Sequence, residues 1–195
     1  MKIINEGAEA RIFSADLFGN SVIVKERQRK AYRIEQIDNE LRTARTKREA
    51  KVLHEVSRLG VNAPRLLAIG KFSIYMSRVN GKLLKDSKSG SRLFLEIGRQ
   101  LALIHNGNVA HGDFTPANIM LSDGKPFVID FGLSEMTSSI EEKAIDLLLM
   151  KRSIDMEQYK AFIKSYAKHS KNSREMIARL ASIERRGRYQ TRTLA

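Results

Sequence analysis

The 195-residue sequence contains no cysteine and no tryptophan, and it has only three prolines. Without cysteine the chain can form neither disulfide bridges nor thiolate metal sites, and it has no cysteine nucleophile. No apolar run approaches the roughly 20 residues that a membrane-spanning helix needs, and the first residues lack the pattern of a signal peptide. We therefore expect a cytoplasmic protein without a membrane segment.

Acidic residues are scarce. The 35 lysines and arginines outnumber the 22 aspartates and glutamates, which gives a formal net charge of +13. A basic field of this size attracts polyanions such as nucleic acid. The excess is uneven, because residues 107–150 contain two lysines and seven carboxylates. Since carboxylates supply the oxygen ligands that divalent cations prefer, this acidic stretch favours a metal site.

Apolar patterning divides the chain into a strand-rich part and a helical part. Short apolar runs predict strands at 3–4, 11–13, 22–24, 66–69 and 72–76. One helix is predicted among them, over 38–59, with Gly60 as its stop. The later pattern predicts short strands at 119–121 and 127–129 and helices near 93–104, 140–152, 156–168 and 173–186. We expect an α+β chain with two lobes: a small β-rich N-terminal lobe with one helix (1–79), a reduced, mainly helical C-terminal lobe (80–184), and a basic tail (185–195).

Residues 111–118 and 130–132 carry the strongest chemical pattern, His-Gly-Asp-Phe-Thr-Pro-Ala-Asn followed by Asp-Phe-Gly. Phosphoryl transfer needs a carboxylate that accepts or orients the attacking proton, and oxygen ligands that hold Mg²⁺ against the phosphates. Asp113 fits the first role. Asn118, five residues along the same loop, and Asp130, which follows an apolar strand, fit the second. This order and spacing are typical of a protein-kinase-like fold that uses ATP and Mg²⁺.

Lys25 is the candidate for binding the nucleotide phosphates. It ends a Val-Ile-Val-Lys strand, which is similar to the Val-Ala-Ile-Lys strand whose lysine holds the α- and β-phosphates in kinases. A glutamate on the following helix would pair with this ammonium and orient it. Glu49 is favoured because helical spacing places it on the same side as the apolar positions, while Glu40 and Glu55 remain alternatives.

The stretch 5–10 lies where kinases place a glycine-rich loop, yet it offers only Gly7. We predict that Gly7, Ala8 and Glu9 form a short loop covering the phosphates. An anion is unexpected in that place, so Glu9 either helps to hold a metal or contacts the helix. The segment 76–79, with Ser77 and Val79, is predicted to form the hinge that touches adenine.

The chain has little room to dock a peptide. A protein kinase has a long activation segment and an Ala-Pro-Glu anchor after Asp-Phe-Gly, whereas here a helix is predicted to open soon afterwards, at Glu141-Glu142. We therefore expect ATP binding and cleavage without a general platform for peptide substrates. His105 is expected to pack against the catalytic loop. Asp146 either braces that loop by hydrogen bonding or is an ordinary helical aspartate.

Together these segments resemble the small atypical kinase, or ATPase, subunit of the KEOPS complex, of archaeal type. The resemblance covers nearly the whole chain. It rests on residues 7–10, 25–33, 45–50, 111–118, 130–134 and 141–146 and on the tail Arg186-Gly187-Arg188-Tyr189, past which 190–195 extend.

The resemblance implies a serine/threonine phosphotransferase or ATPase that supports threonylcarbamoyladenosine modification of tRNA. It also implies two protein partners: the threonylcarbamoyltransferase subunit, and a small accessory subunit that binds the N-terminal lobe. The tail, with Arg185, Arg186, Arg188 and Tyr189, would lie towards the transferase and the tRNA, where its arginines could contact phosphates. The alternative for the tail is an exposed C-terminus without a partner.

Two other functions stay open. The His-Gly-Asp-x-x-x-x-Asn pattern also occurs in small-molecule phosphotransferases such as aminoglycoside and choline kinases, although those enzymes usually carry a larger C-terminal lobe. A non-catalytic scaffold would share the fold, but the presence of Lys25, Asp113, Asn118 and Asp130 together argues against it.

Overall fold

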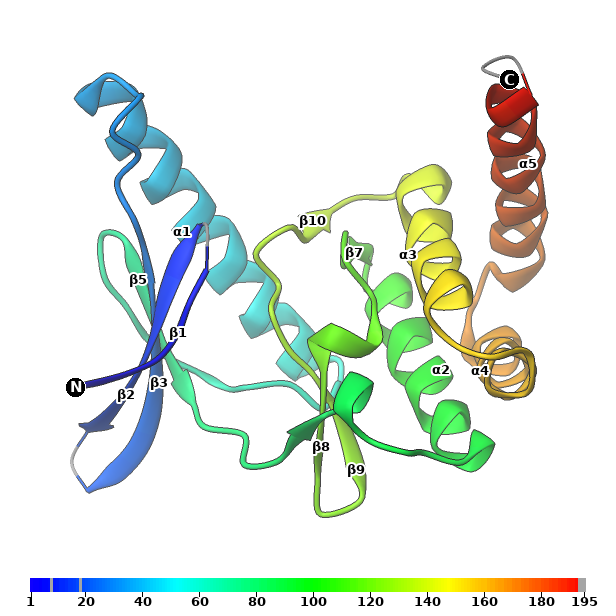
Figure 1. The fold of residues 1–195 in the computed structure, drawn as a ribbon, viewed down its shortest axis with the longest axis horizontal. Coiled ribbons are helices and arrows are strands. Elements are labelled where there is room, and N and C mark those ends of the chain that lie inside the picture. Colours follow the sequence, from blue (N-terminus) through cyan, green and yellow to red (C-terminus); the bar gives the residue numbers. More distant parts are fainter. Residues whose placement is uncertain (8, 18, 193–195) are drawn as a thin grey trace.

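The computed structural model describes residues 1–7, 9–17 and 19–192, with side chains as far as Arg186. A five-stranded antiparallel sheet forms the N-terminal lobe, in the order β1-β2-β3-β5-β4 (Figure 1). Its strands are β1 (Lys2–Glu6), β2 (Ala10–Leu17), β3 (Asn20–Arg27), β4 (Leu66–Ile69) and β5 (Ser73–Ser77). On the central strand β3, Val22 and Val24 are buried on one face, and Lys25 and Arg27 are buried on the other.

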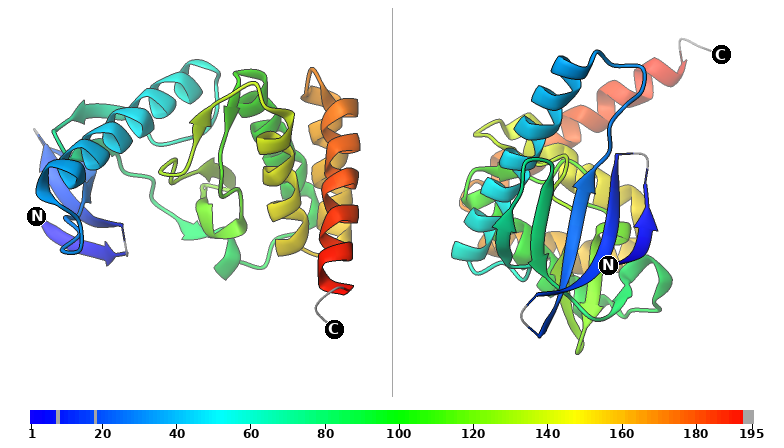
Figure 2. Two further views of the ribbon diagram at one scale, coloured as in Figure 1. Left: turned by 90° about the horizontal axis from the view of Figure 1, so that it is seen from above. Right: turned by 90° about the vertical axis from the view of Figure 1, so that its left-hand side faces the viewer.

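Helix α1 (Glu35–Arg58) lies across one face of this sheet (Figure 2). Its second half carries the buried apolar residues Val52, Leu53 and Val56, which pack in the core of the molecule. The chain turns away from the helix at Gly60, whose φ of +74° is a conformation that glycine adopts without strain. The prediction of a helix over 38–59 is thus confirmed, with three further residues at its start.

The C-terminal lobe is mainly helical and holds two small antiparallel sheets. Its helices are α2 (Ser91–Asn106), α3 (Ile140–Ser153), α4 (Met156–His169) and α5 (Ser173–Arg192). One sheet orders β6 (Lys82–Leu83), β8 (Ile119–Ser122) and β9 (Lys125–Val128), and the other pairs β7 (Val109–Ala110) with β10 (Glu135–Met136). Single turns of 3₁₀ helix precede α2 (η1, Leu84–Asp86) and β8 (η2, Pro116–Asn118). The helix predicted over 173–186 extends to Arg192.

Helices α2 and α4 pack closely because of Gly98. An added Cβ at Gly98 would lie 2.2 Å from the carbonyl oxygen of Phe162 on α4. Around this contact the side chains of Phe94 and Ile97 on α2 and of Phe162 and Tyr166 on α4 are almost fully buried. This core supports the loops that follow α2.

The α+β fold class with a β-rich N-terminal part and a helical C-terminal part is confirmed. Within the described residues, no helix is both long enough and apolar enough to cross a lipid bilayer.

Candidate active site

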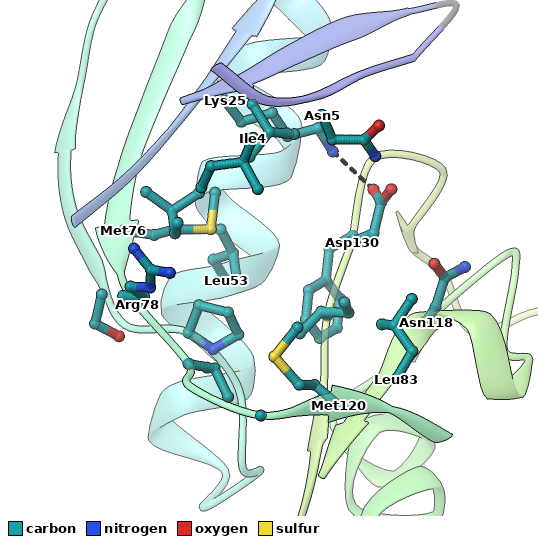
Figure 3. A pocket seen from close by; sticks show the side chains of 18 of the residues that line it. Ile4, Asn5, Lys25, Leu53, Met76, Arg78, Leu83, Asn118, Met120 and Asp130 are labelled. Atoms are coloured by element: carbon teal, nitrogen blue, oxygen red, sulfur yellow. Dashed lines mark hydrogen bonds and ion pairs between the residues drawn. The ribbon is translucent and has the colours of Figure 1, made fainter. Parts of the chain in front are cut away.

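A cleft of about 510 Å³ separates the two lobes. The N-terminal lobe lines it from β1, β2, β3, β5 and α1, and the C-terminal lobe lines it with residues 117–118, 120 and 129–131. Figure 3 shows Lys25 reaching into this cleft from the sheet, opposite Asp130 and Asn118. The structure thus gathers residues that are far apart in the sequence around one cavity.

Lys25 forms two ion pairs at the inner end of the cleft. Its Nζ lies 2.7 Å from Oε1 of Glu49 and 2.7 Å from Oδ1 of Asp130. Burial of this ammonium acts to lower its pKa, but the negative charges of Glu49 and Asp130 outweigh burial, so the pKa of Lys25 is raised. Lys25 therefore stays protonated and can bind an anionic phosphate.

Glu49 is the helix glutamate that reaches Lys25. Its second oxygen, Oε2, accepts a hydrogen bond of 2.6 Å from Nη2 of Arg27, which lies two residues after Lys25 and on the same face of β3. Glu55 instead pairs with Arg58 at 3.3 Å on the surface of α1, and Glu40 is exposed. The structure thus brings together Lys25 and Glu49, the pair that the helical pattern favours.

The loop of residues 111–118, the candidate catalytic loop, holds Asp113 and Asn118 against each other. The side-chain amide of Asn118 donates to Oδ2 of Asp113 at 2.7 Å and to the Asp113 carbonyl at 2.9 Å. Because Nδ2 is used in these bonds, the amide oxygen of Asn118 remains available as a ligand. The pair therefore combines a fixed carboxylate with an oxygen donor that borders the cleft.

Asp146 on α3 braces this loop from below. Its Oδ2 accepts the backbone N–H of His111 at 2.7 Å, and its Oδ1 accepts that of Gly112 at 2.9 Å. His105 on α2 lies 3.2 Å from the same Oδ2 and 2.8 Å from the hydroxyl of Tyr166 on α4. Of the two alternatives for Asp146, the bracing role matches these contacts. Burial lowers the pKa of His105, so the imidazole is neutral at pH 7 and acts as a hydrogen-bonding link.

Asp130 has a φ of +60°, in the left-handed region that glycine adopts most readily and that asparagine and aspartate tolerate better than most residues. The backbone N–H of Gly132 donates to its Oδ1 at 3.1 Å. Burial acts to raise the pKa of Asp130, but the nearby charge of Lys25 outweighs it and holds the pKa of this carboxyl below its usual range. The carboxylate is therefore ionised, and half of its side-chain surface is exposed.

Of the two segments predicted to bind the nucleotide, the hinge lines the cleft, whereas the described residues of the phosphate-covering loop do not. Ser77 and Val79 line the cavity, together with Ile4 and Asn5 of β1, whereas Gly7 and Glu9 are not among the described residues that line it. Glu9 points to the helix, where its Oε2 lies 2.7 Å from Nη1 of Arg45. Ala8 lies outside the described residues.

Several cleft residues had no signal in the sequence. Ile4, Asn5, Leu83 and Met120 line the cavity, and no motif marks them in the sequence, whereas Arg78 lies within the predicted hinge 76–79. Only their pairing across sheets brings them to the cleft.

The basic tail begins inside α5. Arg185 is exposed, and Arg186 forms an ion pair with Glu141 at the start of α3. The side chains of Arg188 and Tyr189 lie outside the described residues. The structure therefore places two of the four predicted tail residues on the surface of the helical lobe.

The donor set fits a magnesium ion that is shared with a phosphate ligand. Within the described part of the chain, no three histidine, aspartate or glutamate side chains group into a cage of their own. Mg²⁺ is typically held by one or two protein oxygens together with substrate phosphates and water. Asn118 and Asp130, which face the same cleft, would supply those two ligands.

A comparison with family models identifies a RIO domain over residues 19–176. The chain belongs to the RIO domain family. Within it, the chain is 36% identical to "KEOPS complex subunit Bud32" of Pyrococcus abyssi, over 99% of this chain and 98% of that protein. The resemblance to the KEOPS kinase subunit is therefore confirmed.

A longer relative and a solved structure extend this comparison. The chain is 37% identical to a "Probable bifunctional tRNA threonylcarbamoyladenosine biosynthesis protein" of Methanobrevibacter smithii, over 96% of this chain but only 36% of that protein. The structure of a "Rio2 kinase-ADP/Mg2+-phosphoaspartate complex" from Chaetomium thermophilum has a TM-score of 0.62 at 17% identity, covering 97% of this chain and 72% of that one. The RIO-domain chain thus has an atypical kinase fold.

Proposed function

We propose that this RIO-domain chain binds ATP with Mg²⁺ in the cleft between its lobes and acts as the kinase or ATPase subunit of a KEOPS complex. The observation that carries the proposal is the convergence of Lys25, Glu49, Asn118 and Asp130 on one cavity, with Asp113 hydrogen-bonded to Asn118. These residues supply a phosphate-binding cation, its orienting anion, a base and two metal ligands, which are the groups that phosphoryl transfer needs.

Each residue has a defined part in this chemistry. Lys25 keeps its ion pair with Glu49 and binds phosphate oxygens. These oxygens replace the Asp130 carboxylate as the second partner of the Lys25 ammonium. Asn118 and Asp130 present oxygens for Mg²⁺, and the metal, when bound, neutralises the charge that develops on the phosphates. Asp113, fixed by Asn118, orients the attacking hydroxyl or water and accepts its proton. The apolar residues Leu53, Met76 and Met120 offer a surface for the adenine ring.

The relatives support a role in tRNA modification. One relative is named as a KEOPS subunit and another as a threonylcarbamoyladenosine biosynthesis protein. We infer that the chain assembles with a threonylcarbamoyltransferase subunit and a small accessory subunit and that its ATP hydrolysis supports this modification of tRNA. The net charge of +13 suits a polyanionic RNA partner.

The proposal is tested by measuring ATP turnover for the wild type and for Asp130→Asn, with and without tRNA and a transferase partner. Losing the metal-binding charge should lower turnover by roughly a hundredfold or more. Asp123→Asn is the matched control, because Asp123 is an exposed aspartate in the turn between β8 and β9. Wild-type turnover in Asp130→Asn would contradict the metal assignment, and strong activity on a small alcohol alone would favour a small-molecule phosphotransferase.

A further inference from the structure

A row of alternating charges runs from the candidate metal ligand to the outer part of helix α1. It begins with Asp130, Lys25 and Glu49, continues through Arg27, and reaches Glu9 and then Arg45. Each member is followed by one of opposite sign. The row arises because Lys25 and Arg27 share a face of β3, while Arg45 and Glu49 lie one turn apart on α1.

Arg27 is the central member of this row. Its side chain is 4% exposed, and its two terminal nitrogens face different carboxylates: Nη2 lies 2.6 Å from Oε2 of Glu49, and Nη1 lies 3.8 Å from Oε2 of Glu9. A buried guanidinium needs carboxylate partners to offset the hydration that it gives up. Glu9 and Glu49 therefore together compensate the positive charge of the buried Arg27 guanidinium.

Glu9 is itself held from the other side. Nη1 of Arg45 donates to its Oε2 at 2.7 Å, and this hydrogen bond lowers the pKa of Glu9. The backbone of Glu9 is also held by the residue that follows β3, since the N–H of Gln28 donates to the Glu9 carbonyl at 3.2 Å. The residue before β2 is thus fastened to both α1 and β3.

We propose that Glu9 is a positioning residue that acts through Arg27 and Glu49 to set the place of the Lys25 ammonium, with Arg45 fixing the Glu9 carboxylate. This inference rests on the proposed function, because it concerns how that cleft receives a nucleotide. While Glu9 balances Arg27, only one oxygen of Glu49 is bound to Arg27 and the other orients Lys25.

The charge balance predicts what happens when Glu9 is neutralised. Arg27 then has Glu49 as its only carboxylate partner. Its guanidinium draws both oxygens of Glu49 into a pair of parallel hydrogen bonds, which is the geometry that arginine prefers with a carboxylate. Lys25 loses its orienting partner and remains bound to Asp130, the carboxylate that the metal needs. Neutralising Glu9 should therefore weaken nucleotide binding more than it slows the chemical step.

The experiment compares Glu9→Gln with Glu6→Gln. Glu6 is a matched control, because it is a carboxylate at the start of the same loop and pairs with Arg11 at 2.7 Å on the exposed surface. We would measure the dissociation constant of Mg-ADP by calorimetry, the thermal midpoint without ligand, and kcat and KM for ATP. Glu9→Gln should weaken ADP binding and raise KM by about fivefold, as expected for one member of a coupled charge network, with a smaller change in kcat. Glu6→Gln should match the wild type.

Two further variants separate positioning from general stability. Arg45→Lys keeps the charge and should retain wild-type affinity, whereas Arg45→Gln should weaken binding but add nothing in the Glu9→Gln background, because both act through one contact. Equal ADP affinity in Glu9→Gln and Glu6→Gln, or a lowered thermal midpoint with unchanged affinity, would overturn the inference. If the wild type itself bound no nucleotide, the proposed function would fail instead.

Discussion

Both carboxylate oxygens of Asp146 accept hydrogen bonds from the backbone of the candidate catalytic loop. The N–H groups of His111 and Gly112 point at it from the segment that leads into Asp113. Asp146 and His111 are both fully buried, so the bond to the His111 N–H replaces a contact with water that this backbone group cannot regain. The position of the candidate base thus depends on a residue that does not line the cleft.

The substitution Asp146→Asn is expected to disturb this arrangement. Asparagine has one acceptor oxygen, and its amide would face a backbone N–H, so one buried donor loses its partner at a cost of about 1–3 kcal/mol. Urea denaturation should show this loss, and kcat should fall more than ATP affinity. Asp155→Asn is the control, because Asp155 is the exposed N-cap of α4 and asparagine caps equally well. Equal effects of the two substitutions would argue against the bracing role.

The sequence predicts some site residues better than others. Asp113, Asn118 and Asp130 follow from spacing along the chain, since they lie on two short loops with a recognisable pattern. Arg27 acts through a contact that spans 22 positions, which no local pattern records, and the bracing contact of Asp146, which spans 35 positions, was only one of two alternatives that the sequence left open. The orientation of Glu9 likewise depends on where α1 passes the sheet.

At the scale of elements, the helices were predictable because their apolar period is long and regular. The strands β6, β7 and β10 were missed, since each has only two residues and is defined by its partner. The pairing of β7 with β10 joins the loop before Asp113 to the segment after Asp130, and neither segment shows a strand pattern on its own. Short pairings of this kind depend on tertiary structure.

The contact between α2 and α4 gives a prediction at this scale. Alanine normally stabilises a helix interior by about 1 kcal/mol relative to glycine. At Gly98, however, the added methyl would meet the backbone of α4, which cannot move aside, so Gly98→Ala should destabilise the protein by about 1–3 kcal/mol. Urea denaturation measures this change. Gly90→Ala, where an added Cβ meets nothing within 4 Å, is the control for the clash, and its only expected cost is that of alanine replacing glycine at the N-cap of α2. A stabilised Gly98→Ala would show that the two helices can separate without cost.

At the scale of the whole molecule, the described side chains of α5 become exposed towards its end. Ile183 packs against the core and Glu184 pairs with Lys151 at 2.7 Å, while Arg185 and Arg186 are exposed. A truncation after Glu184 therefore keeps the buried side chains that the structure describes in this helix, gives up the surface ion pair of Arg186 with Glu141, and removes the four arginines of 185–195.

We expect this truncation to weaken tRNA binding and to leave ADP affinity unchanged. The slope of log affinity against log salt concentration should become shallower by about one for each RNA phosphate that the shortened chain no longer neutralises. Binding titrations at several salt concentrations measure both quantities. A full-length variant with these arginines replaced by glutamine separates charge from helix length. If ADP and tRNA binding fell together, the segment would instead support the fold.

Tyr166, His105 and Asp146 join α4, α2 and α3 to the backbone that leads into Asp113. None of these three helices could be deleted to build a smaller phosphotransferase. Each deletion would leave a buried polar atom without its hydrogen-bond partner, close to the candidate catalytic residues. Room for insertions, labels or fused domains lies elsewhere, for example at the exposed turn of Asp123 and Gly124.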